Sequence, residues 1–72
     1  MGTAEKIKIL LVKRGKSQKS LAERLDMSAE SFNNKLRRES FDVKELETIA
    51  TALDATYSFK EWFTLNDTGE EI

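Results

Sequence analysis

The sequence has 72 residues, with 12 Lys and Arg against 13 Asp and Glu, and it contains no His, Cys or Pro. A chain of this length forms one small domain, and without Cys or His it offers neither a disulfide nor the usual ligands of zinc. The same absences remove Ser–His, Cys–His and His–metal chemistry, so we predict a protein that is not an enzyme and needs no metal or cofactor.

No apolar run approaches the roughly 20 residues that a membrane span needs, and no signal peptide is visible. We therefore expect a cytoplasmic protein that does not bind membranes. We expect no second domain that senses a small molecule, and no such ligand. A domain this short buries only about 60% of the surface of its unfolded chain, which leaves a partner chain as the remaining aid to stability.

Charge is unevenly distributed along the chain. Residues 1–38 carry ten bases and four acids, a net +6, whereas residues 39–72 carry two bases and nine acids, a net −7. Such asymmetry indicates one side that faces a polyanion and another that faces elsewhere. A simpler interpretation is that charged residues only solvate helices, and the count alone does not choose between the two.

The first predicted helix covers residues 3–14. Apolar residues recur at helical spacing between Ile7 and Leu11, Thr3 can cap the start, and Gly15 suits the end. A second, shorter helix over 18–25 has one apolar face, and Ser17 is its cap candidate.

The third predicted helix covers residues 29–37, after a tight connection. Ser28 can cap its start, with Met27 and Phe32 at the positions of a hydrophobic staple across the cap. Phe32 and Leu36 share one face of this helix. The opposite face carries Ala29, Glu30, Asn33, Asn34 and Arg37.

The fourth predicted helix, 43–53, has the best-defined start in the chain. Asp42 and Glu45 have the spacing of a capping box, and Phe41 and Leu46 that of its staple. An apolar stripe follows at Val43, Leu46, Ile49, Ala50 and Leu53.

After Asp54 the pattern changes to alternation with a period of two, which predicts a strand near 56–65. Residues 66–69 form a turn signal, and residues 70–72 can pair back as a short hairpin return. A fifth helix is the alternative, because Phe59, Trp62 and Phe63 are also spaced i, i+3, i+4. We thus predict a single, mainly α domain over 1–72, with four helices and a C-terminal strand or hairpin over 56–72.

Two short helices joined by a tight turn, residues 17–37, have the spacing of a helix-turn-helix. The opening Ser17-Gln18, the small Ala22 and the apolar Leu21, Leu25 and Phe32 resemble the lambda-repressor/Cro-like (Xre-type) helix-turn-helix family. The resemblance covers about residues 3–54, because the helix over 43–53 also fits the fourth helix of that family.

Two positions depart from the family pattern. Asp26 stands in the turn where the family usually has Gly, at a position that needs a left-handed backbone, which Asp tolerates at some cost. Lys35 stands where the family often has an apolar residue, and Leu36 follows one position later. This second departure puts the pitch of the third helix in question.

The resemblance implies that the third helix enters the major groove of DNA, where its early exposed residues meet base edges. By position, the base contacts are Ala29, Glu30, Asn33 and Asn34. The resemblance implies that Gln18 hydrogen-bonds to a phosphate of the DNA backbone. The other expected phosphate contacts are Lys19, Ser28, Ser31, Lys35, Arg37 and Arg38.

Members of this family usually bind two half-sites as symmetric dimers, so we also expect a homodimer. Its interface candidates are Tyr57, Phe59, Trp62 and Phe63. Simpler roles compete for several residues. Glu30, Arg37 and Arg38 can serve the helix dipole alone, and the Trp62–Phe63 pair can belong to the core.

The sequence therefore predicts a sequence-specific, DNA-binding transcriptional regulator of phage-repressor type that acts on double-stranded DNA. The alternative is a protein-interaction or antitoxin-like accessory module that keeps the fold without binding DNA. The acidic second half and the isoelectric point near 5.4 favour this alternative.

Overall fold

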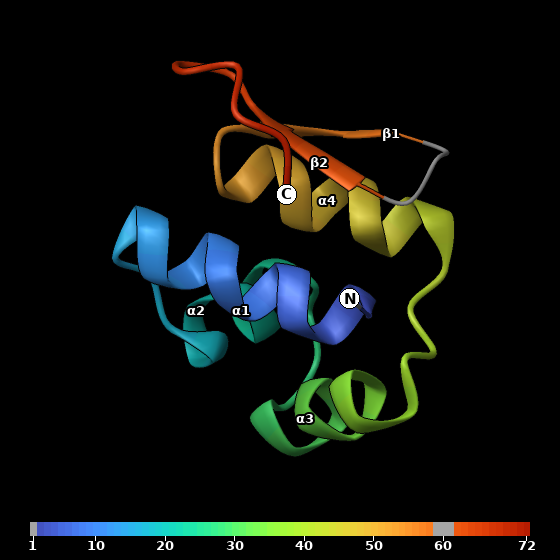
Figure 1. Ribbon diagram of the computed structural model, residues 1–72. Helices are drawn as coiled ribbons and strands as arrows, with labels where there is room; N and C mark the ends of the chain where they lie inside the picture. The colour runs from blue at the N-terminus through green and yellow to red at the C-terminus, as the bar shows by residue number, and fades with distance from the viewer. Residues whose placement is uncertain (1, 59–61) are drawn as a thin grey trace.

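The computed structural model describes residues 2–58 and 62–72. Its elements are α1 (Thr3–Arg14), α2 (Gln18–Arg24), α3 (Ala29–Arg38), α4 (Val43–Ala52), β1 (Ala55–Ser58) and β2 (Trp62–Leu65). The two strands and α4 form the upper part of the molecule in Figure 1, α1 and α2 cross the middle, and α3 lies at the lower end. The predicted mainly α fold with four helices and a C-terminal hairpin is confirmed.

The predicted caps of the last three helices are present. The Ser17 and Ser28 hydroxyls accept hydrogen bonds from the backbone N–H groups three residues later, both at 3.1 Å. Asp42 and Glu45 form the complete capping box, with the two reciprocal bonds at 2.8 and 3.0 Å. These caps satisfy N–H groups that no carbonyl within the helix can reach.

The predicted cap of α1 is wrong. Thr3 is the first residue inside the helix, and Gly2 occupies the capping position without a side-chain hydrogen bond. A carboxylate oxygen of Glu39, from the connection between α3 and α4, instead accepts a hydrogen bond from the Ala4 N–H at 3.2 Å. A residue distant in sequence has therefore taken the role that the local pattern assigned to Thr3. The predicted end of α1 is confirmed, because Gly15 has a left-handed backbone with φ of 63°.

The connection between α2 and α3 contains the left-handed residue that the sequence predicted. Asp26 has φ of 58°. The Asp26 N–H donates to the Glu23 carbonyl at 3.1 Å, and the Met27 N–H donates to the Ala22 carbonyl at 3.0 Å. These bonds end α2 at Arg24, one residue earlier than predicted, and return the chain at once to the start of α3.

One apolar core joins the helices to the hairpin. Phe32 and Leu36 of α3 are buried in it, and the Phe32 ring lies 5.3 Å from the ring of Phe41. Val43 was predicted in the buried stripe of α4, but its side chain is 62% exposed. The stripe begins at Leu46, because Phe41, which precedes the helix cap, packs against the core at this end of α4.

The prediction of one continuous strand over 56–65 is wrong, and so is the alternative of a fifth helix. β1 and β2 pair with each other as antiparallel strands, with Ala55 opposite Leu65 and Tyr57 opposite Phe63. This pairing satisfies backbone groups that a single long strand would leave open along both edges. The predicted position of Phe59 lies outside the described residues.

The predicted hairpin return at the C-terminus is present. Phe63 and Ile72 exchange two backbone hydrogen bonds, at 2.8 and 3.1 Å, and Thr64 forms an isolated bridge with Glu71. β2 therefore lies between β1 and the C-terminal segment. Among the described residues, no helix is long and apolar enough to cross a lipid bilayer.

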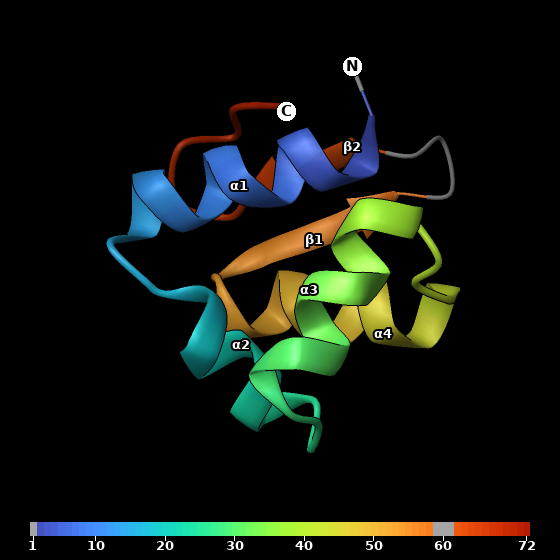
Figure 2. The ribbon, with the colours of Figure 1, turned by 90° about the horizontal axis from the view of Figure 1, so that it is seen from below.

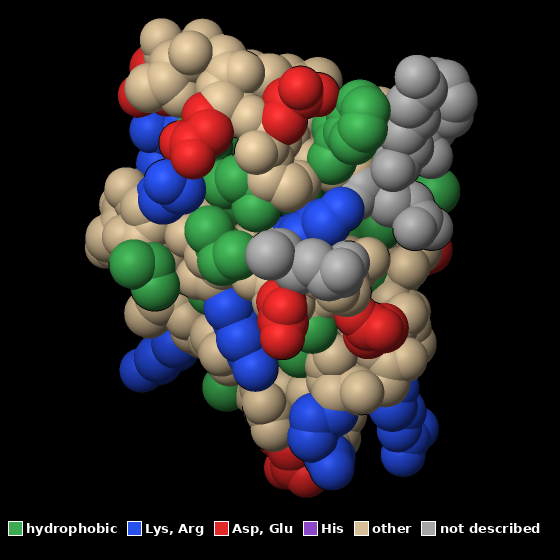
Figure 3. All heavy atoms as spheres, viewed as in Figure 1, with side chains coloured by type: hydrophobic (Ala, Val, Ile, Leu, Met, Phe, Trp, Pro, Cys, Tyr) green, Lys and Arg blue, Asp and Glu red, His purple; other side chains and the backbone are tan. Residues whose placement is uncertain are grey.

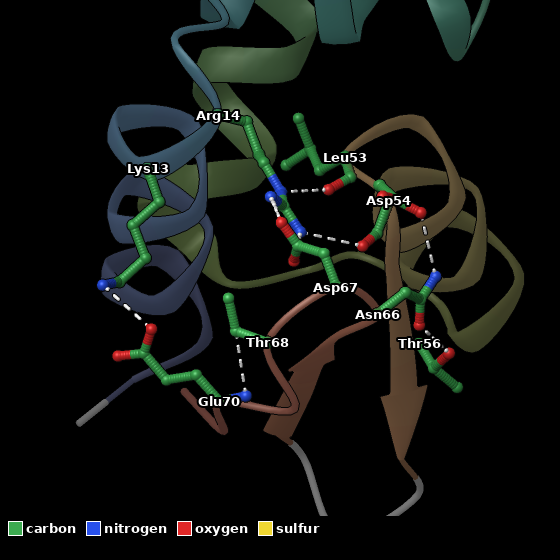
Figure 4. A network of polar contacts seen from close by, with 9 residues as sticks. All are labelled: Lys13, Arg14, Leu53, Asp54, Thr56, Asn66, Asp67, Thr68 and Glu70. Atoms are coloured by element: carbon green, nitrogen blue, oxygen red, sulfur yellow. Dashed lines mark hydrogen bonds and ion pairs between the residues drawn. The ribbon is translucent and has the colours of Figure 1, made fainter.

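Arg14, at the end of α1, joins three segments that are distant in sequence (Figure 4). Its Nε donates to the Leu53 carbonyl at 2.8 Å, and Nη2 donates to the Asp54 carbonyl at 3.1 Å. The two terminal nitrogens also bind both carboxylate oxygens of Asp67, at 2.7 and 2.9 Å. One guanidinium thus holds the end of α1 against the end of α4 and the turn after β2.

The Arg14 hydrogen bonds lower the pKa of Asp67 from 3.8 to about 2, whereas the carboxylate raises the pKa of Arg14. Because the pKa of Asp67 is lower in the folded chain than in the unfolded chain, its pairing stabilises the fold fully above about pH 4. This contribution is lost as the pH falls toward 2.

We predict that Asp67→Asn lowers the thermal midpoint at pH 7, and that the gap to the parent chain closes between about pH 4 and pH 2. Circular dichroism melting at several pH values measures this gap. Glu70→Gln is the control, because its ion pair with Lys13, at 3.1 Å, is more exposed and contributes little. A gap that stays constant down to pH 2 would contradict the prediction.

We also predict that Asp26→Gly stabilises the fold by about 0.5 kcal/mol, because glycine has no side-chain strain at positive φ. The thermal midpoint should rise by about 2–4 °C. Gly15→Ala makes the opposite change, because it adds a side chain at a residue with positive φ. A Cβ there meets nothing within 4 Å, so its expected loss of about 1 kcal/mol reflects the left-handed backbone alone. A lower midpoint for Asp26→Gly would show that the Asp side chain itself supports the turn.

Candidate nucleic-acid interface

The outer face of α3 is the candidate interface. Ala29, Glu30 and Asn33 are exposed, whereas Phe32 and Leu36 are buried on the opposite face. In Figure 2, which views the molecule from below, α3 lies in front of α4. The polar face that the sequence predicted is therefore exposed, and α3 carries it at one end of the molecule.

The burial of Leu36 answers the question of the pitch of α3. Leu36 is 2% exposed and lies one helical turn after Phe32, so both belong to the same buried stripe. Lys35 is therefore turned away from the core. The departure from the family pattern has moved the buried position from residue 35 to Leu36 and has left the outer face polar.

Lys35 forms an ion pair across the molecule with Glu45 of α4, at 2.5 Å. Glu45 also completes the capping box through its other carboxylate oxygen. This single carboxylate links the start of α4 to the middle of α3. Lys35 was predicted as a phosphate contact, and any phosphate would have to compete with Glu45 for its ammonium group.

Asn34 and Arg37 contact each other on α3. Nη2 of Arg37 donates to Oδ1 of Asn34 at 2.5 Å. Asn34 is half-buried and Arg37 is exposed. The sequence predicted that Asn34 contacts a base and that Arg37 contacts a phosphate. Their i, i+3 spacing was a signal that the two side chains could also meet each other.

The predicted phosphate contacts lie around α3 and at the start of α2. Lys19 and Arg38 are exposed, and Gln18 is half-buried. The Ser28 hydroxyl, which caps α3, also donates to the Ser31 hydroxyl at 3.0 Å. Both serines are exposed beside the first turn of α3.

Ion pairs within the fold neutralise part of the charge difference between the two halves of the chain. Each of the three ion pairs among the described residues joins a base of residues 1–38 to an acid of residues 39–72. These pairs neutralise three charges of each half. Lys and Arg side chains still protrude at the lower end of Figure 3, where Figure 1 places α3.

Residues 6–58 match the family described as the Cro/C1-type HTH DNA-binding domain. The chain belongs to this family. The match extends from α1 to the last residue of β1, so it includes the complete helix-turn-helix. Comparisons with curated proteins and with solved structures found no match.

As a member of the Cro/C1-type family, the chain carries a DNA-binding domain, and domains of this family are typically not enzymes. Within residues 2–58 and 62–72, no cluster of three or more acidic side chains could hold a metal ion.

We predict that the Asn33 side chain does not stabilise the fold. Asn is a poorer helix former than Ala, so Asn33→Ala on this exposed face should stabilise the fold by about 0.5 kcal/mol. The corresponding rise in the thermal midpoint is about 2–4 °C. Glu30→Ala is a useful comparison, because it removes an acid that favours the helix start and should destabilise α3 slightly. A lower midpoint for Asn33→Ala would assign Asn33 a structural role.

Proposed function

We propose that the chain is a sequence-specific transcriptional regulator of phage-repressor type, which binds double-stranded DNA as a homodimer and reads the major groove with α3. The observation that carries the proposal is the polar outer face of α3, opposite the buried Phe32 and Leu36. This face belongs to the second helix of a helix-turn-helix, the element that such domains insert into the groove.

The side chains on this face suit the edges of bases. The methyl group of Ala29 can contact a thymine methyl, Glu30 can accept from cytosine, and Asn33 and Asn34 can hydrogen-bond to purines. Two adjacent Asn residues weaken a helix, and a role in reading bases accounts for their presence on its outer face.

The surrounding residues suit the phosphate backbone. Lys19 and Arg38 are exposed cations, and Gln18, Ser28 and Ser31 offer hydrogen-bond donors beside the starts of α2 and α3. Cations near phosphates release counterions, which makes binding steeply dependent on salt. Arg37 and Lys35 belong to the same predicted set, each with an intramolecular partner in the free chain.

The proposed homodimer uses the hairpin. β2 is paired on both sides, so β1 and the C-terminal segment are the two edges of the described sheet. An edge strand favours pairing with a second copy of the chain. Tyr57 and Trp62, both half-buried, remain interface candidates, whereas Phe63 is fully buried within the chain and has no surface left for a partner.

Selection from a random pool of DNA duplexes tests the proposal. We expect enrichment of an inverted repeat, with half-sites about one helical turn apart because a twofold dimer presents two copies of α3. Lys19→Ala should weaken binding about equally to all sequences and reduce the salt slope by about 1. Sedimentation should show a dimer at micromolar concentration.

Different negative results would contradict different parts of the proposal. A monomer that enriches a single half-site would overturn the homodimer and leave DNA reading intact. If no sequence is enriched and Lys19→Ala changes nothing, the proposal fails, and the alternative of a protein-interaction or antitoxin-like module takes its place.

A further inference from the structure

The contact between Asn34 and Arg37 determines which groups α3 can offer to a base. Nη2 of Arg37 donates to Oδ1 of Asn34 at 2.5 Å, and both residues belong to the C-terminal half of the helix. A guanidinium has only hydrogen-bond donors. The amide oxygen of Asn34 must therefore face Arg37, because the opposite orientation would place donor against donor.

This orientation matters for the choice of base. An Asn that reads adenine accepts from the adenine N6 amino group through Oδ1 while its NH₂ donates to N7. In this chain Arg37 competes with adenine for that oxygen. This hydrogen bond leaves the NH₂ group of Asn34 available as a donor, and it uses only one of the five N–H groups of Arg37.

We propose that Asn34 and Arg37 act as one unit that presents donors to the major groove and selects guanine. Guanine is the base that offers two acceptors there, N7 and O6, and no amino group. Arg37 is then a specificity residue that both positions Asn34 and contributes a donor, in place of a phosphate contact. This inference rests on the proposed function, since it names the base that the same surface reads.

Arg38 provides the matched control. It is the next residue in the chain, carries the same charge and is exposed, but it points about 100° further around the helix. If Arg37 acts only through its charge, Arg37→Ala and Arg38→Ala should behave alike. If Arg37 belongs to a reading unit, only Arg37→Ala should change the base preference.

The experiment selects DNA from a random duplex pool with the full chain and with Asn34→Ala, Arg37→Ala, Arg37→Lys and Arg38→Ala. The position whose preference changes in Asn34→Ala identifies the base read by the unit. At that position we expect the parent chain to prefer guanine over adenine by about tenfold, within the usual range for a good contact. Circular dichroism confirms that each variant is folded.

Arg37→Ala should reduce the guanine preference at that position to about twofold or shift it to adenine, because Asn34 then regains its oxygen. Arg37→Lys should also lose most of the preference, since an ammonium keeps the charge without the planar fork. Arg38→Ala should weaken binding to all sequences and keep the preference for guanine.

The inference is overturned if the parent chain prefers adenine at this position. It is also overturned if Arg37→Ala keeps the guanine preference and merely weakens binding, as Arg38→Ala does. Both results would leave DNA recognition itself intact. If the parent chain enriches no sequence at all, the proposed function fails, and the inference that rests on it fails too. The absence of any enriched sequence distinguishes this outcome from the two above.

Discussion

The geometry of the candidate interface depends on one backbone constraint, the left-handed conformation of Asp26. Its φ of 58° lets the Asp26 and Met27 N–H groups bind the last carbonyls of α2, so that α3 begins only a few residues after α2 ends. Phe32 then enters the core. Because Phe32 and Leu36 hold one side of α3 inside, the polar side has to face outward. An extended residue at position 26 would direct α3 elsewhere and separate Phe32 from the core.

The acidic half of the chain has a structural role that net charge does not reveal. Asp67, Glu70 and Glu45 each pair with a base from the first half. The Arg14 network ties the hairpin to α1 and to the end of α4, while Glu45 holds Lys35 against α4. Through the Asp67 and Glu45 pairs, the second half therefore helps to hold together the fold that carries α3.

α3 combines a strongly anchored inner face with an outer face that does not favour helix formation. Asn33 and Asn34 are poor helix formers, and the cap at Ser28 together with the burial of Phe32 offsets their cost. The contact between Asn34 and Arg37 adds order to this outer face before any ligand arrives. A surface with oriented amide and guanidinium groups loses less side-chain entropy on binding than one with free rotamers.

By itself, the sequence determined the features that depend on neighbours three or four residues away. The caps at Ser17 and Ser28, the capping box of Asp42 and Glu45 and the end of α1 at Gly15 were predicted, because each is a local interaction. The left-handed backbone of Asp26 was implied by the resemblance to the family. The buried face of α3 followed from helical spacing for the same reason.

Only the tertiary structure decided the features whose partners are far apart in sequence. Glu39 replaces Thr3 at the start of α1 across 35 residues, and Arg14 reaches Asp67 across 53 residues. The division of the predicted strand into β1 and β2 likewise reflects the pairing of the chain with itself. Periodicity and cap patterns carry no information about such partners, because the fold alone brings them within hydrogen-bond distance.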